Sequence, residues 1–439
     1  MIEVIIKILQ LLLSLSILVV IHELGHFIPA KLFKTKVEKF YLFFDWPFSL
    51  FKKKIGNTEY GIGVLPLGGY VKIAGMIDES MDTDHLDKEP EPWEYRSKPA
   101  WQRLIIISGG VIVNLILGFA IYMMVAFTWG KTVLTNQDLP AGFEVAEVMK
   151  TYGFEDGDKI LQVNGEDIES VRDISKYLFL RDVNQVRVER YNGKKENISI
   201  PENIGTIMFE NGAINAFVPM VPAVLDSIVP NSPAFNAGLL SGDRVLRVNG
   251  NDIVKWQDFT ELVKANNSPN INLEIERGNE IISNIIPLNE DKKIGVTVKL
   301  PKIVPTKLEY TFFESIKEGY DRAYWTFADY IGQFKYVFTQ QGLSQLGGFG
   351  AIGGLYPATW NWQGFWETTA FISIILAFMN ALPIPALDGG HAMFLFYEMI
   401  SGRKPNDKVM GYAQMFGFIL LMTLVLYANG NDVYKYFFN

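Results

Sequence analysis

The chain has 439 residues, of which 49% are hydrophobic, a formal net charge of −8 and no cysteine. The acidic balance offers no basic surface for nucleic acid, and the lack of cysteine excludes disulfides, thiolate metal ligands and a cysteine nucleophile. This length allows more than one domain, so the distribution of apolar residues along the chain decides the class of protein.

The apolar residues concentrate in four stretches that are each long enough to cross a bilayer. A hydrocarbon core of about 30 Å needs roughly 20 residues of helix. A signal peptide is a poor interpretation of the first stretch, because Met1-Ile2-Glu3 provides no basic start. The sequence therefore predicts a multi-pass α-helical membrane protein with four transmembrane helices. The four stretches run from Val4 to Ile28, Leu104 to Trp129, Thr368 to Leu387 and Val409 to Ala428.

Basic residues predict the orientation of these spans. Seven lysines follow the first span, between Lys31 and Lys54, and Arg403, Lys404 and Lys408 crowd the short connection between spans three and four. Loops rich in lysine and arginine remain in the cytoplasm. Both termini and the long segment between spans two and three are then expected on the outer side.

The first span carries the motif His22-Glu23-Leu24-Gly25-His26 near its end. Residues four apart share a helical face, so His22 and His26 can bind one metal ion while Glu23 holds a water molecule and takes its proton. Ionisable residues inside a span are costly and usually mark function. The motif therefore indicates a zinc-dependent protease, and the competing interpretation is a hydrogen-bonded cluster at the membrane interface.

The segment from Glu59 to Gly75 alternates like a β-hairpin but is rich in glycine. An apolar hairpin beside a membrane helix must satisfy its backbone inside protein or a wet cavity, so a re-entrant element that lines the active site is one possibility. A hairpin on the cytoplasmic surface is the other. The acidic segment from Asp78 to Glu94, which contains His85, predicts a solvated loop.

The segment from about Lys131 to Lys307 predicts a soluble region that contains an internal repeat. Residues Gly153 to Gly165 recur, 85 residues later, as Gly238 to Gly250, each with a Gly-Asp turn, an alternating strand and an Asn-Gly turn. The block resembles PDZ domains of the circularly permuted type found in bacterial proteases. Ser232-Pro233-Ala234 strengthens the match for the second copy, whereas the first copy lacks this lead-in.

The segment after the repeat predicts an amphipathic helix. Apolar residues recur every three or four positions from Phe313 to Phe338, with Glu314, Lys317 and Asp321 among them. Its many aromatic residues suit the membrane surface. A stripe of this kind packs against protein about as often, so both placements stay open.

A catalytic zinc commonly has three protein ligands and an open position for water, so a third ligand is needed. Asp388 is the candidate, in the run from Asn380 to His391 at the end of the third stretch, where Pro383 and Pro385 interrupt helical hydrogen bonding. A carboxylate at this depth needs a partner. A helix cap or an ion pair with a loop lysine are the alternatives.

The two motifs together resemble the site-2 protease family of intramembrane zinc metalloproteases. Four spans, Asn114 in the second, the PDZ-like repeats and Pro66-Leu67-Gly68-Gly69-Tyr70 narrow the resemblance to the bacterial regulator-of-sigma-E protease type. It implies Zn²⁺ bound by His22, His26 and Asp388, with Glu23 as the catalytic base. It also implies Asn380 and Pro383, with Gly68, Gly69 and Tyr70 of the hairpin, as substrate-binding residues.

The resemblance further implies the substrates and the cellular place. Expected substrates are single-span membrane proteins already trimmed on the outer side by a site-1-type protease, including anti-sigma factors and remnant signal peptides. The expected place is the bacterial inner membrane, with the lipid bilayer as a partner, in a stress-response pathway. A PDZ-bearing scaffold or chaperone with a non-catalytic metal site is the alternative function, although the intact Glu23 argues against it.

The sequence predicts five parts in chain order. Residues 1–130 form the first two spans with the hairpin, 131–205 and 206–305 the two PDZ-like α+β domains, 306–362 the amphipathic helix and a linker, and 363–439 the last two spans with Asp388. Two short runs depart from the family pattern, Gly109-Gly110-Val111 and Leu346 to Gly350, and leave the local helix geometry there open.

Overall fold

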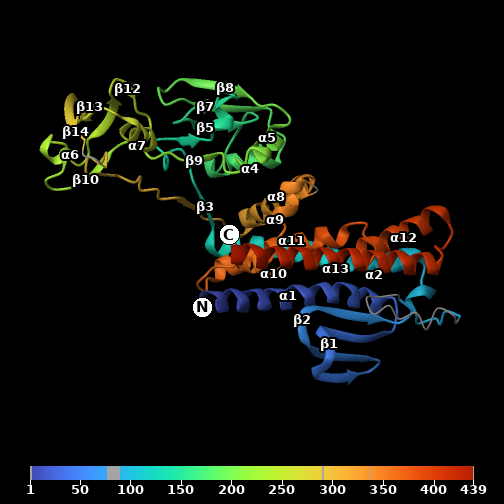
Figure 1. Ribbon diagram of the computed structural model, residues 1–439. Coiled ribbons are helices and arrows are strands. Elements are labelled where there is room, and N and C mark those ends of the chain that lie inside the picture. The colour runs from blue at the N-terminus through green and yellow to red at the C-terminus, as the bar shows by residue number, and fades with distance from the viewer. Residues whose placement is uncertain (1, 77–88, 289–290, 338, 439) are drawn as a thin grey trace. The chain divides into compact units, whose positions relative to one another are not determined.

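The computed structural model describes residues 2–76, 89–288, 291–337 and 339–438 (Figure 1). The chain divides into two compact units, and each is described by itself. One unit joins Met1–Gly130 to Glu309–Asn439, and the other is Lys131–Leu308. His85 and most of the acidic segment around it lie outside the described residues.

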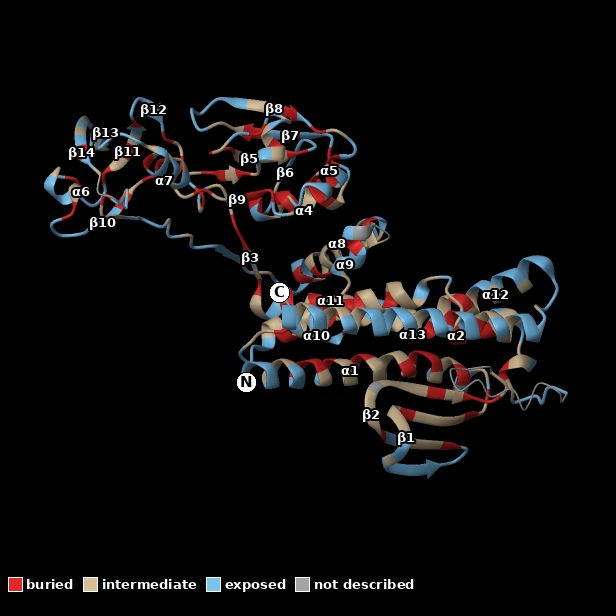
Figure 2. Ribbon diagram, viewed as in Figure 1, coloured by how far each residue is buried: buried red, intermediate tan, exposed pale blue. Residues whose placement is uncertain are grey.

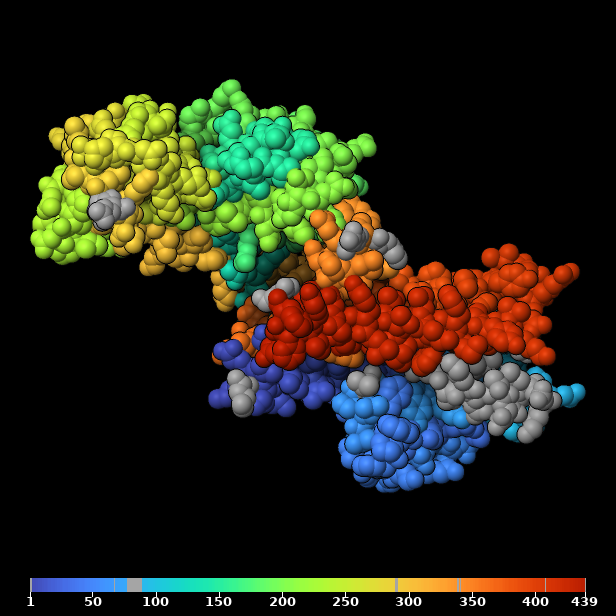
Figure 3. Space-filling view, viewed as in Figure 1, coloured from blue at the N-terminus to red at the C-terminus, as the bar shows by residue number. Residues whose placement is uncertain are grey.

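The prediction of four membrane spans is confirmed for the described part of the chain. Four helices are long and apolar enough to cross a bilayer: α1 (Ile2–Leu32), α2 (Ala100–Trp129), α11 (Trp362–Ala381) and α13 (Asp407–Phe438). Helix α2 packs against both α1 and α11. Helix α13 is largely exposed (Figures 2 and 3). Such a surface is expected where lipid replaces water as the solvent.

Helices α1 and α2 approach each other closely at Gly25 and Gly109. A Cβ atom on Gly25 would lie 2.4 Å from the carbonyl oxygen of Gly109, and one on Gly109 would lie 1.9 Å from that of Gly25. Only glycine permits backbones to touch in this way. Helix α2 continues without interruption through Gly109-Gly110-Val111, so this departure from the family pattern leaves the helix intact.

The composition of the third apolar stretch predicted a span that reaches Leu387, but its helix ends earlier. Helix α11 ends at Ala381, and a new helix, α12 (Asp388–Ser401), begins after six intervening residues. Pro383 lacks a backbone N–H, and Ala386 has a φ of 80°, so the helix cannot continue between the two. Asp388 therefore opens a helix rather than ending one.

The sequence suggested that the glycine-rich segment forms a hairpin on its own, but it does not. It is strand β2 (Thr58–Ile73), which pairs with β1 (Val37–Ile55), a strand that the sequence reasoning missed. Both strands fold back, so that Phe40 pairs with Tyr60 on one side and with Val71 on the other. The result is a curled sheet whose β2 strand packs against α1.

The amphipathic helix is α8 (Phe312–Val337), and it packs against α2. A Cβ atom on Gly319 would lie 2.7 Å from the backbone nitrogen of Met123, and the Thr326 hydroxyl donates to the Tyr122 hydroxyl over 3.3 Å. The predicted aromatic stripe is split. Phe327, Tyr330 and Phe334 surround Phe378 of α11, while Phe313, Tyr320 and Tyr324 are exposed.

Two short helices connect α8 to α11. They are α9 (Gln340–Gln345) and α10 (Phe349–Gly354). The Asp432 carboxylate of α13 accepts hydrogen bonds from the backbone N–H groups of Gly348 and Ala351, over 2.9 and 3.0 Å. Helix α13 therefore fixes the glycine-rich run between α9 and α10.

The second unit contains two four-stranded antiparallel sheets of the same strand order. The orders are β6-β5-β7-β8 and β12-β11-β13-β14. Asn164 and Asn249, at equivalent places in the repeat, have φ values of 53° and 51°, as their Asn-Gly turns require. The first sheet comprises β5 (Lys159–Val163), β6 (Glu166–Asp167), β7 (Gln185–Glu189) and β8 (Lys195–Ser199). The second comprises β11 (Arg244–Val248), β12 (Asn251–Asp252), β13 (Asn270–Arg277) and β14 (Glu280–Pro287).

In each repeat, an arginine forms an ion pair with the aspartate of the Gly-Asp turn. Arg190 binds the fully buried Asp158, and Arg277 binds Asp243, which is 1% exposed. Each guanidinium also donates to a turn carbonyl over 2.8 Å, that of Gly153 or that of Gly238. The repeat in the sequence thus reflects a repeated ion pair that the sequence did not reveal.

Shorter elements complete the second unit. Strand β9 (Phe217–Pro219) pairs with β4 (Phe143–Val145), and helix α5 (Ile204–Glu210) packs against α4 (Ile174–Leu180). Residues up to 219 are therefore tied to the first repeat, whereas the sequence placed the boundary between 205 and 206. The others are β3 (Lys131–Val133), α3 (Glu147–Lys150), β10 (Leu225–Ile228), α6 (Pro233–Asn236), α7 (Trp256–Ala265), β15 (Val296–Val298) and β16 (Thr306–Leu308).

Candidate metal centre

Helix α1 presents His22 and His26 on one face, one turn apart. His26 is 7% exposed and Glu23 is 9% exposed, so both lie inside the protein. The Glu23 carboxylate lies close enough to the His26 ring for the two charges to interact. Because the close contact at Gly25 and Gly109 brings α2 against this turn of α1, the motif is walled by α2 on that side.

Asp388 comes from the other end of the chain and is the first residue of α12. The backbone before it folds tightly over the start of the helix. A Cβ atom on Gly389 would lie 2.2 Å from the carbonyl oxygen of Leu382, and one on Gly390 would lie 2.4 Å from that of Ile384. The two glycines therefore allow the turn that carries Asp388 toward α1.

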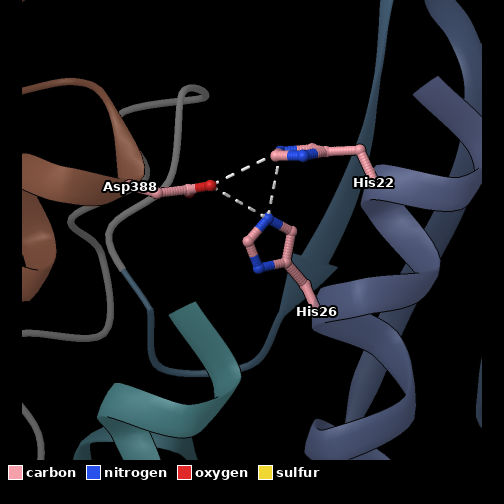
Figure 4. Close-up of side chains that lie close together, drawn as sticks. All are labelled: His22, His26 and Asp388. Atoms are coloured by element: carbon pink, nitrogen blue, oxygen red, sulfur yellow. Dashed lines mark hydrogen bonds and ion pairs between the residues drawn. The ribbon is translucent and has the colours of Figure 1, made fainter. Parts of the chain in front are cut away.

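The three side chains converge on one point (Figure 4). The Asp388 Oδ2 atom lies 3.4 Å from the Nε2 atom of His22 and 3.4 Å from that of His26. The two Nε2 atoms are 3.3 Å apart. Among the described residues, these three form the one group of at least three histidine or carboxylate side chains whose ligand atoms cluster in this way.

This triangle has the dimensions of a zinc site. Zinc bonds of about 2.0–2.1 Å at tetrahedral angles separate ligand atoms by about 3.3–3.4 Å. The Asp388 Oδ2 atom is buried and accepts no hydrogen bond within the described residues, as a carboxylate oxygen kept for a cation would. It does not cap α12 either, because Leu387 occupies the cap position. The donor set therefore fits Zn²⁺.

Helix α2 also contacts the outward nitrogens of both imidazoles. The Nδ1 atom of His26 lies 2.9 Å from the carbonyl oxygen of Ile106, and that of His22 lies 3.2 Å from the Nδ2 atom of Asn114. A Cβ atom on Gly110 would lie 2.5 Å from His22 Cε1 and from His26 Nε2. From the sequence, neither Gly110 nor Asn114 was predicted to belong to the site. Asn114 could have been found, since a lone asparagine in an apolar helix is costly.

Asn380 and Pro383 occupy the end of α11 and the turn that follows it. The Asn380 Nδ2 atom lies 3.4 Å from the Nε2 atom of His22, so this amide borders the metal centre. Pro383 is exposed within the turn between α11 and α12. The structure thus brings Asn380 to the site, while Pro383 shapes the turn that leads to Asp388.

The hairpin residues expected to bind substrate occupy the last part of β2. A Cβ atom on Gly69 would lie 2.5 Å from a methyl carbon of Val19, so this strand lies against α1 just before His22. Tyr70 is committed elsewhere in the sheet. Its hydroxyl donates to Asp45 over 3.0 Å and accepts from Lys39 over 3.2 Å. Burial and the neighbouring Asp45 carboxylate raise the pKa of Tyr70, so it stays neutral.

His391 is not part of the metal centre. It lies one turn after Asp388 on α12, within 3.2 Å of the Nε2 atom of Gln414 on α13. An ion pair between Arg103 of α2 and Glu398 of α12 holds α12 in place. Both residues of this pair are nearly buried, so the pair is a firm anchor for the helix that carries Asp388.

Comparison with known protein families matches the chain to Peptidase family M50 over residues 10–424. Curated relatives are similar over nearly their whole length. A protein of Neisseria meningitidis named "Putative zinc metalloprotease NMA0084" is 27% identical, with 96% of this chain and 97% of the relative covered. The "Regulator of sigma-E protease RseP" of Escherichia coli is 28% identical over 95% of this chain and 96% of its own. The "Regulator of sigma E protease" of Haemophilus influenzae is also 28% identical, over 96% and 97%.

Proposed function

The chain belongs to Peptidase family M50, and on that premise we propose that it cleaves single-span membrane proteins within or near their membrane segments. As a family member it is an intramembrane zinc metalloprotease, and its place is the bacterial inner membrane. The observation that carries the proposal is the triangle of the buried His26 with the half-buried His22 and Asp388, whose sides of 3.3 to 3.4 Å match a zinc site.

The metal ligands in this proposal are His22, His26 and Asp388. A zinc ion held by these three side chains would lower the pKa of a water molecule and polarise the carbonyl of the scissile bond. Glu23, buried on the same helical turn, takes the proton of that water and returns it to the leaving nitrogen. Asn380, whose amide borders the site, donates a hydrogen bond to the substrate or to the oxyanion.

The substrate in this proposal binds as an added strand on β2. Residues Gly69 to Ile73 of β2 pair on one side with β1, and among the described residues no strand pairs with their other edge. An unpaired edge accepts an extended peptide through main-chain hydrogen bonds. Gly68, Gly69 and Tyr70 then contact the substrate chain, while Pro383 lines the approach from the turn before Asp388.

The two repeats of the second unit are PDZ domains in this proposal, on the outer side of the membrane. Their shared strand order supports it, as does Ser232, whose hydroxyl accepts from the backbone N–H of Phe235 at the start of α6. The substrates are membrane proteins shortened beforehand by a site-1-type protease, such as anti-sigma factors and remnant signal peptides.

The substitution Glu23→Gln tests the mechanism. We expect cleavage of a trimmed single-span substrate to fall by at least about 100-fold, because the amide cannot accept a proton, while zinc stays bound. Purified protein in detergent micelles is assayed for cleavage and for zinc by atomic absorption. Glu3→Gln, at the exposed start of the same helix, is the matched control.

Substitution of a ligand should have a different signature. His22→Ala, His26→Ala and Asp388→Asn should each lose zinc together with activity. Wild-type cleavage by Glu23→Gln would contradict the catalytic role of this carboxylate. Loss of cleavage with normal zinc content in all three ligand variants would instead contradict the assignment of the metal centre, and a zinc-free wild-type protein would favour the scaffold function.

A further inference from the structure

Asn114 is the one polar side chain in the middle of α2, and it is fully buried. Its Nδ2 atom lies 3.2 Å from the Nδ1 atom of His22, on the side of the ring that faces away from Asp388. Its Oδ1 atom is buried and has no hydrogen-bond partner within the described residues. A buried polar atom without a hydrogen bond destabilises the folded protein by about 1–3 kcal/mol, so the orientation of the Asn114 amide needs a physical reason.

The tautomer of His22 decides what Asn114 can do. The Nε2 atom of His22 points into the centre and must offer a lone pair to a metal ion, so the ring proton resides on Nδ1. An Nδ1–H group cannot bind the amide N–H₂ group, because both are donors. Exchange of the oxygen and nitrogen positions of the amide, which have nearly the same shape, puts an acceptor at 3.2 Å and uses the unpaired oxygen.

We propose that the side-chain oxygen of Asn114 accepts a hydrogen bond from the Nδ1–H group of His22, and thereby positions this histidine for zinc. The inference rests on the proposed ligation of zinc by His22. His26 has a matching arrangement, since its Nδ1–H group donates to the carbonyl oxygen of Ile106 over 2.9 Å. One face of α2 therefore fixes the tautomer and the ring orientation of both imidazoles.

The surroundings of Asn114 hold the amide in place. The Ser373 hydroxyl of α11 donates to the backbone carbonyl of Asn114 over 2.7 Å, and Ser373 is itself fully buried. Outer partners of this kind raise the basicity of a ligating histidine and restrict its motion. Their loss typically lowers metal affinity about 10- to 100-fold. Asn114 is thus a positioning residue, and it does not touch the substrate.

The test compares Asn114→Leu with Asn114→Asp. Leucine has nearly the same volume but no acceptor, so zinc affinity should fall about 10- to 100-fold. Aspartate keeps an acceptor oxygen at the same place and should bind zinc within about threefold of wild type. Affinity is measured by titration with a competing chelator on the full chain in micelles. Ile112→Ala, at an exposed position two residues earlier on the same helix, is the matched control and should bind zinc as wild type does.

The tautomer of His22 gives a second readout. The chain has only four histidines, so a ¹⁵N spectrum of histidine-labelled protein resolves each ring, and His22→Ala assigns the signals. Zinc-loaded wild type should show a protonated Nδ1 on His22 in slow exchange, and Asn114→Leu should lose this protection. If Asn114→Leu does not fold, Asn114→Ser, whose hydroxyl is too short to reach the ring, replaces it.

Two results would overturn the inference. Equal loss of zinc affinity in Asn114→Leu and Asn114→Asp would mean that the amide only packs. Wild-type affinity in Asn114→Leu would mean that a hydrogen bond donated by His22 to the Gly110 backbone suffices. Neither result touches the proposed function, which is tested separately by the zinc content of the wild-type protein and by the Glu23 and ligand variants.

Discussion

At the scale of single residues, the metal centre depends on how closely α2 approaches two imidazole rings. Gly110 has no side chain, and a Cβ atom there would lie 2.5 Å from atoms of both His22 and His26. That distance is well inside van der Waals contact, so any side chain must push the rings apart. In the proposed metal centre the H-E-x-x-H motif supplies two ligands, and the lack of a side chain at Gly110 leaves room for them.

Gly110→Ala should therefore damage the centre without harming the helix. Alanine is the better helix former, so α2 should persist. Because displacement of a reacting group by about 1 Å can cost 100-fold, we expect cleavage to fall by about that factor, with weaker zinc binding. Gly118→Ala on the same helix is the control, since its Cβ atom would meet the flexible end of Ile374. Equal effects of the two substitutions on zinc affinity would refute the role of Gly110.

At the scale of elements, an ion cluster joins the two repeats of the second unit. Lys255, which is 8% exposed and lies at the start of α7, binds Glu144 over 2.9 Å and Asp156 over 3.1 Å. Asp156 also accepts from the backbone N–H of Val145 and from Lys150. Burial would raise the pKa of Asp156, but these hydrogen bonds and cations outweigh it and hold the pKa below its usual value.

Lys255→Met should loosen the first repeat from the second. Removal of one partner of a nearly buried pair leaves the carboxylates short of a cation, and we expect a loss of about 1–2 kcal/mol in the local free energy of opening. Hydrogen exchange on the full chain measures it at Phe143–Val145. Lys264→Met, at the end of the same helix, is the control. Unchanged exchange in Lys255→Met would refute the link.

The same cluster predicts a dependence on pH. Because the folded pKa of Asp156 lies below the usual 3.8, its contribution to stability is complete above that value and is lost as the pH falls through the lower, folded pKa. The difference in opening free energy between wild type and Lys255→Met should therefore be constant at neutral pH and shrink below pH 3.8. A difference that grows on acidification would show that Asp156 does not carry the interaction.

At the scale of the whole molecule, the distribution of basic residues predicts the orientation in the membrane. Lys53 lies in the β1 strand after the first span, and Lys404 lies between α12 and α13, so both are expected in the cytoplasm. The Asn-Gly turns at Asn164 and Asn249 belong to the second unit, between spans two and three. They are expected on the outer side.

The cysteine-free chain permits a direct test of this orientation. Single cysteines at Lys53, Lys404, Asn164 and Asn249 are treated with an impermeant maleimide in intact spheroplasts. The last two should be labelled, and the first two only after the membrane is opened. Lysed spheroplasts, in which all four should react, are the control. Labelling of Lys53→Cys or Lys404→Cys in intact spheroplasts, with Asn164→Cys and Asn249→Cys protected, would invert the assigned orientation.

Features that arise from neighbouring residues could be predicted without the structure. Helical spacing puts His22 and His26 on one face, apolar length marks the four spans, and recurrence of the Gly-Asp and Asn-Gly turns marks the two sheets of equal topology. Each of these patterns is formed by residues that are close together in the sequence, where backbone geometry alone fixes which side chains are neighbours. Asp388 could be nominated because a carboxylate beside an apolar run needs a partner.

Features that depend on contacts between distant segments could be seen only in the folded protein. The approach of Asp388 to within 3.4 Å of both histidines requires the new helix α12, which the sequence did not predict, after the interruption expected at Pro383 and Pro385. The pairing of β2 with β1 and the contact of Asn114 with His22 were likewise absent from the local pattern. Such contacts form when backbones pack closely, as at Gly25 and Gly109, and packing between remote segments leaves no periodic trace in the sequence.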